Sequence, residues 1–319
     1  MTLLTNMLVR QVLVDEQGMA KGVTCVDRTN KREVEIYGKV VVLSASRVET
    51  AHIMLNSKSR RWPTGIANSS SQLGKNLCEH LYGGPGYGHL PRLLGQAPLP
   101  DNIADSTAWM PRWQNLKNPR EEKSIRDYSL YIGGGCGEFP SYYRQIEGFG
   151  AEFKRQIKRY YPTPISSYIQ APTLPHPDNY LDIDPDKKDI FGIPQLRFHF
   201  KWHENELLMF EHSKQVMIEL FKAMGAEHWG AAFEPDRPGT SLHETGVCRM
   251  GNDLKRFVTN KWGQTHDVAN LYICDASIFP NCTDKTTTMP IVAFTMRGCD
   301  HMLENFMLEN FRNGTHKRA

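Results

Sequence analysis

The feature that most constrains this chain is a short apolar run, Leu271–Cys274, which lies between a polar turn and a helix. Four apolar residues in a row have the length of a buried strand. Asp275 follows at the carboxyl end of that strand, where open α/β sheets hold their ligands. The threonine-rich loop that comes next ends at Thr288, a natural N-cap, and Pro290 suits the first helical turn. The stretch therefore predicts a strand, a loop and a helix packed in an α/β fold.

The helix after Thr288 is expected to be mostly buried, because few of its positions are polar. Its apolar residues are Ile291, Val292, Phe294, Met296, Cys299 and Met302. The free N–H groups and the dipole at its amino end favour a negatively charged group in the preceding loop. Upstream, His243 lies in a turn bounded by Gly246 and Gly251, and an imidazole there can exchange a proton near neutral pH. These features occur in many α/β proteins and do not define a function.

Other segments have clear periodicity. Residues 3–37 predict a three-stranded meander with a tight turn at Asp15–Gly18. The continuous apolar run in Lys39–Ser44 predicts a buried parallel strand, followed by a helix from Val48 to Asn56. Glu204–Met224 predicts an amphipathic helix that ends at Gly225. Further strands are predicted at residues 129–132, 166–170, 180–183 and 195–201.

Several spaced motifs resemble the C-terminal signature of the glucose–methanol–choline (GMC) oxidoreductases: His243–Gly251 (HETGVCRMG), Asp275-Ala276-Ser277, Pro280 and Thr286–Thr288. Within that family, the sugar and gluconate dehydrogenase branch is the most similar. Gly74–His80 (GKNLCEH) resembles the step at which the family's chain leaves its FAD domain for its substrate domain. The resemblance implies an enzyme that uses FAD to oxidise an alcohol to a carbonyl compound.

The resemblance also implies the organisation of the chain. We expect an α/β fold of mixed α+β character, with a partial Rossmann-like FAD-binding domain made from residues 1–80 and 240–319. Residues 81–239 would form a substrate-binding domain with a mixed β-sheet covered by helices.

The dinucleotide-binding fingerprint G-x-G-x-x-G is missing. Gly83–Gly88 (GGPGYG) contains a proline and lacks a preceding strand and a following helix. Met1 is therefore expected to be an internal or misassigned start, or the gene to be split, or the chain to be a fragment. The isolated chain is expected to bind FAD weakly or not at all.

Two positions would do the chemistry if the resemblance holds. His243 falls where the family has its catalytic histidine, so it would take the proton of the substrate hydroxyl while flavin takes the hydride. A structural histidine remains the alternative. The family's second position, usually His or Asn, falls on Thr286 when counted from Pro280. A threonine can make one hydrogen bond but cannot act as a base, and the neighbouring Lys285 is an alternative. Val247 replaces the usual threonine of the first motif.

Five residues match cofactor-binding positions of the family: Val9, Ala45, Asp275, Ala276 and Thr287. Each has a structural alternative. Val9 can be an ordinary strand core residue, Ala45 can be small for strand–helix packing, and Asp275 can cap the strand end. The threonines can cap the helix. His80, in the second motif, is expected to satisfy backbone groups at the domain junction rather than to take part in catalysis.

Composition excludes several classes of function. A net charge of +3 gives no reason to expect nucleic acid or an anionic membrane as partner, and no apolar run is long enough to span a bilayer. The seven cysteines form no C-x-x-C pair, so they are expected to be reduced and the chain to be cytoplasmic, with export as part of a complex left open. His199 and His203 lie four apart on a predicted strand, too far apart to share a metal.

The sequence therefore predicts an FAD-dependent oxidoreductase that acts on the CH–OH group of a sugar, a sugar acid or another small alcohol. A cytochrome or another electron-acceptor subunit is a possible partner. The alternative is a non-catalytic remnant or a partner subunit of a split GMC oxidoreductase that does not bind FAD alone. A serine hydrolase has little support, because no G-x-S-x-G motif is present.

Overall fold

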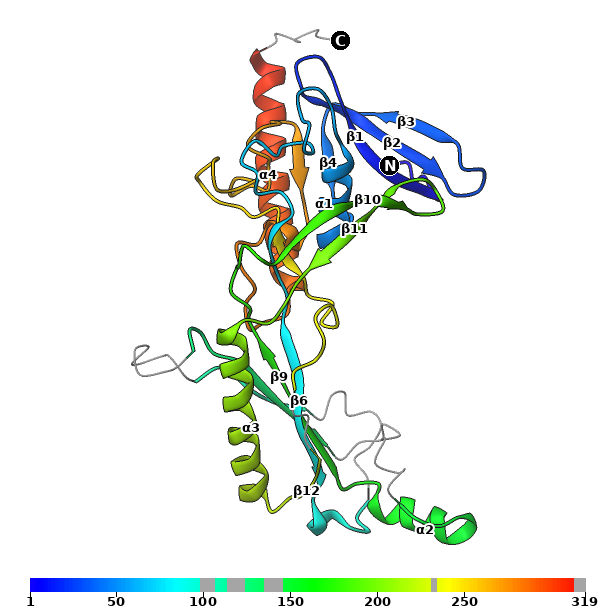
Figure 1. The fold of residues 1–319 in the computed structure, drawn as a ribbon, viewed down its shortest axis with the longest axis vertical. Helices are drawn as coiled ribbons and strands as arrows, with labels where there is room; N and C mark the ends of the chain where they lie inside the picture. Colours follow the sequence, from blue (N-terminus) through cyan, green and yellow to red (C-terminus); the bar gives the residue numbers. More distant parts are fainter. Residues whose placement is uncertain (98–106, 114–123, 135–145, 231–233, 313–319) are drawn as a thin grey trace.

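A computed structural model of the chain describes residues 1–97, 107–113, 124–134, 146–230 and 234–312. The described part is elongated and divides into two regions (Figure 1). We call residues 1–78, 180–199 and 241–312 the motif region, because it contains the sequence motifs. We call residues 81–171 and 204–230 the sheet region, because a five-stranded sheet dominates it.

The motif region begins with the predicted meander. Strands β1 (Met7–Val14), β2 (Ala20–Asp27) and β3 (Glu33–Tyr37) form an antiparallel sheet in that order. Val12 and Ala20 are each 4% exposed and join the core of the region. The alternation of apolar and polar residues thus predicted both the strands and the face that packs inward.

Two short parallel strands lie next to this meander. β4 (Val41–Leu43) pairs with β14 (Leu271–Ile273) in register, so their carboxyl ends meet at the same edge. β14 is buried along its length, as predicted. The expectation for β4 was wrong in one respect, because Val42 is 44% exposed. An apolar run predicts that both faces need to be covered, yet the described residues cover only one face of β4.

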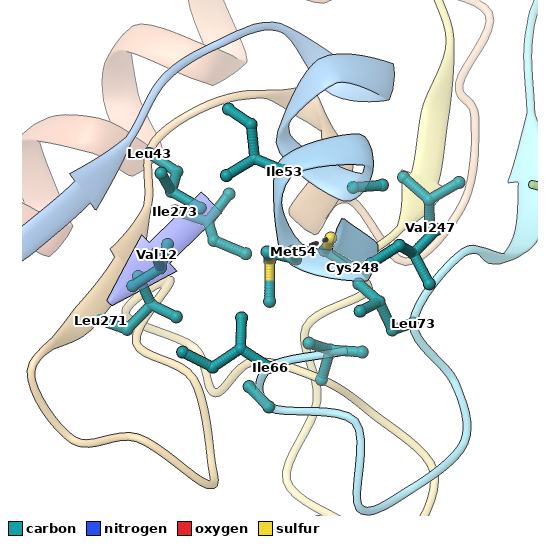
Figure 2. Packing of buried hydrophobic residues seen from close by; sticks show 14 of the residues in the cluster. Val12, Leu43, Ile53, Met54, Ile66, Leu73, Val247, Cys248, Leu271 and Ile273 are labelled. Atoms are coloured by element: carbon teal, nitrogen blue, oxygen red, sulfur yellow. Dashed lines mark hydrogen bonds between the residues drawn. The ribbon is translucent and has the colours of Figure 1, made fainter. Parts of the chain in front are cut away.

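Helix α1 (Arg47–Asn56) follows β4 and supplies the centre of the core. Met54 is fully buried, and apolar side chains from β1, β4, β14 and the loops surround it (Figure 2). The labelled neighbours are Val12, Leu43, Ile53, Ile66, Leu73, Val247, Cys248, Leu271 and Ile273. Each buried side chain of this size contributes about 1.5–3 kcal/mol, and together they fix the strand ends that carry the motif residues.

A second sheet of the motif region has the order β11-β10-β5-β13. Its strands are β5 (Lys75–Cys78), β10 (Tyr180–Lys188), β11 (Pro194–His199) and β13 (Thr245–Val247). β10 and β11 fall in the range expected for the substrate domain, yet Leu181 packs into the core of the motif region. The domain boundaries themselves stay a prediction.

The sheet region contains five strands in the order β12-β6-β9-β8-β7: β6 (Leu81–His89), β7 (Thr107–Met110), β8 (Ser129–Gly134), β9 (Pro164–Ala171) and β12 (Glu227–Gly230). The fold class of mixed α/β character is confirmed, but the neighbouring strands of this sheet all pair antiparallel, whereas a mixed sheet was expected. Two shorter elements, η1 (Pro91–Leu93) and α2 (Gly150–Tyr160), complete the described part of this region.

Helix α3 (Glu204–Met224) lies against β6 and β9. It buries Met209, Phe210, Met217 and Phe221, and it ends at Gly225 as predicted. Gly83 of β6 allows the close approach, because a Cβ there would lie 2.3 Å from the Phe210 ring. Tyr131 and Tyr168 lie opposite each other on neighbouring strands of this sheet.

Helix α4 (Thr288–Arg312) begins at Thr288, so this residue is the first of the helix rather than its cap. The expectation that α4 is mostly buried was wrong. Phe294 and Gly298 pack inward, but the other side carries a row of exposed apolar residues: Met289, Val292, Met296 and Leu303, which are 73%, 46%, 63% and 62% exposed. The composition of a helix shows that its faces need partners, not that this chain provides them.

Three further expectations concern the cysteines, the pair His199 and His203, and membrane-spanning helices. Six cysteines are free thiols, and Cys136 lies outside the described residues. His203 precedes α3 and stacks on His176, while His199 stacks on Tyr180. Of the helices in the described ranges, none combines the length and apolarity that a membrane span requires.

Candidate active site at the junction of the two regions

The turn that carries His243 is held from two sides. Glu79, which is 2% exposed, accepts hydrogen bonds from the Gly239 backbone N–H (2.6 Å) and from Ser241 Oγ (3.1 Å). Arg47, at the start of α1, donates to the backbone carbonyls of Leu242 and Glu244. The turn is therefore fixed between α1 and the end of β5, although it is exposed along much of its backbone.

The imidazole of His243 packs against His80, which lies between β5 and β6, and against Tyr82 of β6. His243 Nδ1 lies 2.9 Å from His80 Nδ1 and 3.2 Å from the Tyr82 hydroxyl. The two imidazole rings are edge-on, with centroids 5.0 Å apart. His243 Nε2 forms no hydrogen bond with any residue in the described part of the chain, so this nitrogen is available to a ligand.

The loop before α4 closes the site from the other side. His80 Nε2 lies 2.6 Å from the carbonyl oxygen of Thr283. Asp284 accepts a hydrogen bond from Ser129 Oγ of β8 (3.2 Å) and forms an ion pair with Lys285. The prediction that His80 satisfies a backbone group is confirmed, and the structure adds its contact with His243. Thus the two motifs, 163 residues apart in sequence, meet through their histidines.

Burial sets the charge of both imidazoles. The pKa of His243 is lowered by burial and by the nearby Arg47 guanidinium, which outweigh the opposing charge of Glu244. For His80, burial and the neighbouring His243 lower the pKa to about 4, against the Thr283 carbonyl and Asp284, which raise it. Both rings are therefore neutral at pH 7, and a neutral imidazole can accept a proton.

The sheet face next to His243 has an aromatic and polar lining. Tyr131 of β8 and Tyr168 of β9 face each other across the strands and stack with centroids 4.5 Å apart. Tyr82 donates to Gln170 Oε1 at 3.0 Å. Burial raises the pKa of Tyr82 above its ordinary value, and the charges of the other two tyrosines add to the effect. This face presents hydroxyl and amide groups that suit a polyhydroxylated ligand.

Two cavities lie next to the residues of the site. One, of about 430 Å³, is lined by Tyr82, Tyr168 and Ser241 among others, so it borders the His243 turn. The second, of about 490 Å³, is lined by the Thr283–Lys285 loop together with Arg112 and Arg126. Each has the volume of a small-molecule site.

The carboxyl ends of β4 and β14 bring three predicted cofactor residues to one edge. Asp275, which is 7% exposed, accepts from Thr50 Oγ1 (2.6 Å) and from the Ser277 backbone N–H (2.8 Å). Ala276 is fully buried below it. Ala45 follows β4, and its N–H is 3.3 Å from Thr50 Oγ1. Asp275 caps a short 3-10 helix, Ala276–Ile278, which is the structural role that was its alternative.

This edge fits one side of an FAD site. A parallel strand, the exposed turn around Ala45 and the start of α1 form the arrangement that binds phosphate in nucleotide-binding folds. Ser46 has a φ of 84° and makes no side-chain cap, so the first N–H groups of α1 remain free of a cap from that side chain. The carboxylate of Asp275 is already hydrogen-bonded within the protein, which suits an orienting role rather than contact with phosphate.

The remaining predicted residues lie in different surroundings. Val9 of β1 is half-buried and packs against the core of the motif region. Thr287 is 3% exposed, and its carbonyl accepts from Ile291 N–H in the first turn of α4. Thr286 is exposed, directly after the loop that contacts His80. The structure therefore connects His243 to the Thr283–Lys285 loop only through His80, and no hydrogen bond between described residues joins His243 to Thr286.

Gly246 of the first motif has a steric role. Its φ is 88°, and a Cβ there would lie 2.2 Å from the Asn76 carbonyl oxygen, because the antiparallel pairing of β13 with β5 is irregular at this point. Val247 also has a positive φ (54°), which is rare for a β-branched residue. Val247 is fully buried in the core. The valine in place of the family's threonine is thus a packing residue.

Comparison with known proteins agrees with this arrangement. The family models described as GMC oxidoreductase match residues 1–82 and 175–295. The chain belongs to the GMC oxidoreductase family. Among curated GMC relatives, 2-methyl-1,2-propanediol dehydrogenase of Mycolicibacterium austroafricanum is 27% identical over 295 residues, covering 91% of this chain and 52% of that protein.

Further GMC relatives support the same assignment. The fructose dehydrogenase large subunit of Gluconobacter japonicus is 24% identical over 95% of this chain and 54% of its own length. The gluconate 2-dehydrogenase flavoprotein of Pantoea cypripedii is 28% identical over 50% of this chain and 27% of its own length. The chain spans about half the length of the first two relatives.

Solved structures show the same fold. Pyridoxine 4-oxidase from Mesorbium loti matches 94% of this chain and 58% of its own with a TM-score of 0.60 and 16% identity. A variant of formate oxidase from Aspergillus oryzae, solved to study the effect of a mutation on FAD modification, is also similar. The match covers 92% of this chain and 59% of the oxidase chain, with a TM-score of 0.62 and 15% identity. FAD is the cofactor that membership of the GMC family implies.

Several residues of the site were not identified from the sequence: Arg47, Glu79, Tyr82, Gln170 and Asp284. Glu79 could have been predicted from the sequence, because it lies between His80 of the second motif and a buried strand end, and a buried carboxylate needs hydrogen-bond partners. The others act through contacts between distant segments, and no local pattern marks them.

Proposed function

We propose that this chain carries the alcohol-oxidising site of an FAD-dependent GMC oxidoreductase that acts on the CH–OH group of a sugar, a sugar acid or another small alcohol. The observation that carries the proposal is the neutral His243 ring, whose Nδ1 contacts His80 and Tyr82 while Nε2 has no hydrogen-bond partner among the described residues. That is the arrangement a general base needs, because the basic atom must reach the substrate hydroxyl.

In this proposal, His243 removes the hydroxyl proton. Burial and Arg47 keep the ring unprotonated at pH 7, and the fixed turn limits its motion. Bound FAD would accept the hydride from the substrate carbon. Thr286 is proposed as a second hydrogen-bonding group for the substrate, since its side chain is exposed next to the loop that contacts His80. Lys285 is less suited, because its ammonium group is held by Asp284 and Ser129.

The cofactor would lie along the strand ends. Ala45, Asp275 and Ala276 are proposed to line it there, with Val9 and Thr287 as the outer contacts. The buried Asp275 carboxylate would orient hydroxyl groups of the ribityl chain through the backbone it already caps. The tyrosine-lined sheet face would cover the substrate, in keeping with the sugar and glycoside substrates named in several relatives.

A second candidate is favoured by the exposed apolar residues of α4 and Val42. Their burial would require a partner beyond the described residues, because the described strands offer β4 only β14 as a partner. In this candidate the chain is a partner subunit of a split GMC oxidoreductase, or a non-catalytic remnant, that binds FAD only when a nucleotide-binding polypeptide covers that face. An electron-acceptor subunit is a further proposed partner.

The test is to mix the purified chain anaerobically with FAD, an artificial electron acceptor and a panel of sugars, sugar acids and simple alcohols. Bleaching of the flavin absorbance by one substrate, lost in the His243→Gln variant, supports the oxidoreductase. Flavin that remains in solution and unreduced with every substrate favours the second candidate. Flavin that stays bound through purification would contradict the expectation that the chain alone binds it weakly.

A further inference from the structure

The hydrogen bonds around His80 and His243 determine which ring nitrogens of the two imidazoles carry protons. His80 Nε2 lies 2.6 Å from the carbonyl oxygen of Thr283, and a carbonyl can only accept a hydrogen bond. His80 Nε2 must therefore carry a proton. The side-chain N–H of Gln170 is 3.4 Å from the same nitrogen, but it has the Asp284 carbonyl as an acceptor. The proton on His80 is thus assigned by a backbone group.

The other nitrogen of His80 follows from its charge. His80 is 1% exposed, and its pKa of about 4 leaves it neutral at pH 7. A neutral imidazole that is protonated on Nε2 has a bare Nδ1, which can only accept. Its neighbour, 2.9 Å away, is His243 Nδ1, so His243 must be the donor of this hydrogen bond.

The third member of the cluster is compatible with that direction. The Tyr82 hydroxyl gives its proton to Gln170 Oε1 at 3.0 Å. Its oxygen is 3.2 Å from His243 Nδ1 and can accept a share of the same N–H. Neither neighbour of His243 Nδ1 therefore has to donate a hydrogen bond to it, and both can accept its proton.

We infer that His80 is a positioning residue that holds His243 in its Nδ1–H tautomer and so leaves Nε2 as the basic nitrogen. The role of that nitrogen as base rests on the proposed function; the tautomer does not. An imidazole in water carries its proton mainly on Nε2, so an unconstrained ring would offer the wrong nitrogen for most of the time. The partner of the other ring nitrogen decides the tautomer.

The consequence for the reaction is a defined path for the proton. The proton would move from the substrate hydroxyl to His243 Nε2, and the C–H hydrogen would leave with its electron pair to FAD when FAD is bound, so that a carbonyl group remains. His243 then carries a positive charge, and its hydrogen bond to His80 becomes charge-assisted and stronger.

A neutral partner orients the base without adding negative charge, unlike a carboxylate. The charged groups that face the pair are Arg47 and Glu244 beside His243 and Asp284 beside His80. His243 therefore remains unprotonated below the pH at which an ordinary histidine would charge.

The tautomer can be measured without flavin. Long-range 1H–15N correlation spectra of the full chain with 15N-labelled histidine distinguish a protonated from a bare ring nitrogen, and the His243→Gln and His80→Asn variants assign the signals. We expect a protonated Nδ1 and a bare Nε2 for His243, and the reverse for His80. In His80→Ala the His243 proton should move mainly to Nε2. His80→Asn, whose amide oxygen can take the place of Nδ1 as acceptor, should restore the Nδ1–H form.

Two further observations make the test decisive. Tyr82→Phe should leave the tautomer unchanged, because the Tyr82 oxygen is the weaker acceptor. With FAD supplied, His80→Ala should lower kcat within the range of about 10²- to 10⁴-fold that a positioned base contributes, at unchanged KM, and His80→Asn should recover part of it. An Nε2–H tautomer of His243 in the unsubstituted chain would overturn the inference, even if His80→Ala does not fold. Full activity of His243→Gln would instead overturn the proposed base and leave the tautomer assignment standing.

Discussion

The two regions bury their apolar residues to different degrees. In the sheet region, α3 covers one face of the sheet, and the largest side chains of that helix, such as Phe210, are nearly inaccessible. In the motif region the centre around Met54 is equally dense, but Val42 and one side of α4 remain exposed. Among the described residues, the core beneath α3 is closed, although Leu207 and Ile218 on the outer side of that helix are 43% and 42% exposed. The motif region has an equally closed centre, but its edges at β4 and α4 are uncovered. The comparison separates residues that hold this chain together from those that are available to something else.

The largest expected effect is loss of packing in the sheet region. Phe210→Ala should lower the free energy of unfolding by about 3–5 kcal/mol, because the ring is 1% exposed and fills the space above Gly83. Denaturant unfolding followed by circular dichroism measures it. Phe149→Ala is the control, since that ring is 91% exposed. Equal losses for the two variants would break the comparison.

The second effect is on stability as a function of pH, at the contact between the regions. His80 has a folded pKa of about 4, below the ordinary value of 6.5. Between these values the unfolded chain binds more protons, so stability falls as the pH falls through this window. The full difference corresponds to about 3 kcal/mol. Urea midpoints at pH 7, 6 and 5 should decrease, and His80→Asn should flatten the trend; an unchanged slope in that variant would contradict the burial of the neutral ring.

The third effect is on the His243 turn. Arg47→Met removes hydrogen bonds to two backbone carbonyls, and because one of them is only partly buried and the other is exposed, their loss should cost about 1 kcal/mol in total. It also removes a charge that lowers the pKa of His243, so this pKa should rise. NMR titration of the His243 ring checks the direction. Arg155→Met, on the exposed helix α2, is the matched control and should leave the titration unchanged.

The smallest effect is expected on the exposed side of α4. Met296→Gln should change the free energy of unfolding by less than about 0.5 kcal/mol, because the side chain is 63% exposed. The same substitution should reduce binding of a hydrophobic dye if this row is the accessible apolar surface. A loss of stability as large as that of Phe210→Ala would show that Met296 is buried and that the two regions do not differ in this way.

Local patterns predicted most of the elements and few of the contacts that make the site. The meander, β14 and α3 followed from alternation, apolar runs and a glycine at the helix end, which depend on neighbouring residues only. The exposure of Val42 and Met296 could not be predicted, because apolar composition shows that a face needs covering and not what covers it. The contact of His80 with His243 was also missed, since it joins segments 163 residues apart. Thr286 was placed by counting from Pro280, and counting does not show which side chains meet.

The most direct test of the account is the rate of flavin reduction in a single anaerobic turnover with FAD supplied, compared between the unsubstituted chain and His243→Gln. The account predicts a loss of about 10²- to 10⁴-fold, as expected for removal of a general base, with the unfolding transition unchanged. Reduction of the flavin at the same rate in both proteins would show that His243 does not accept the substrate proton.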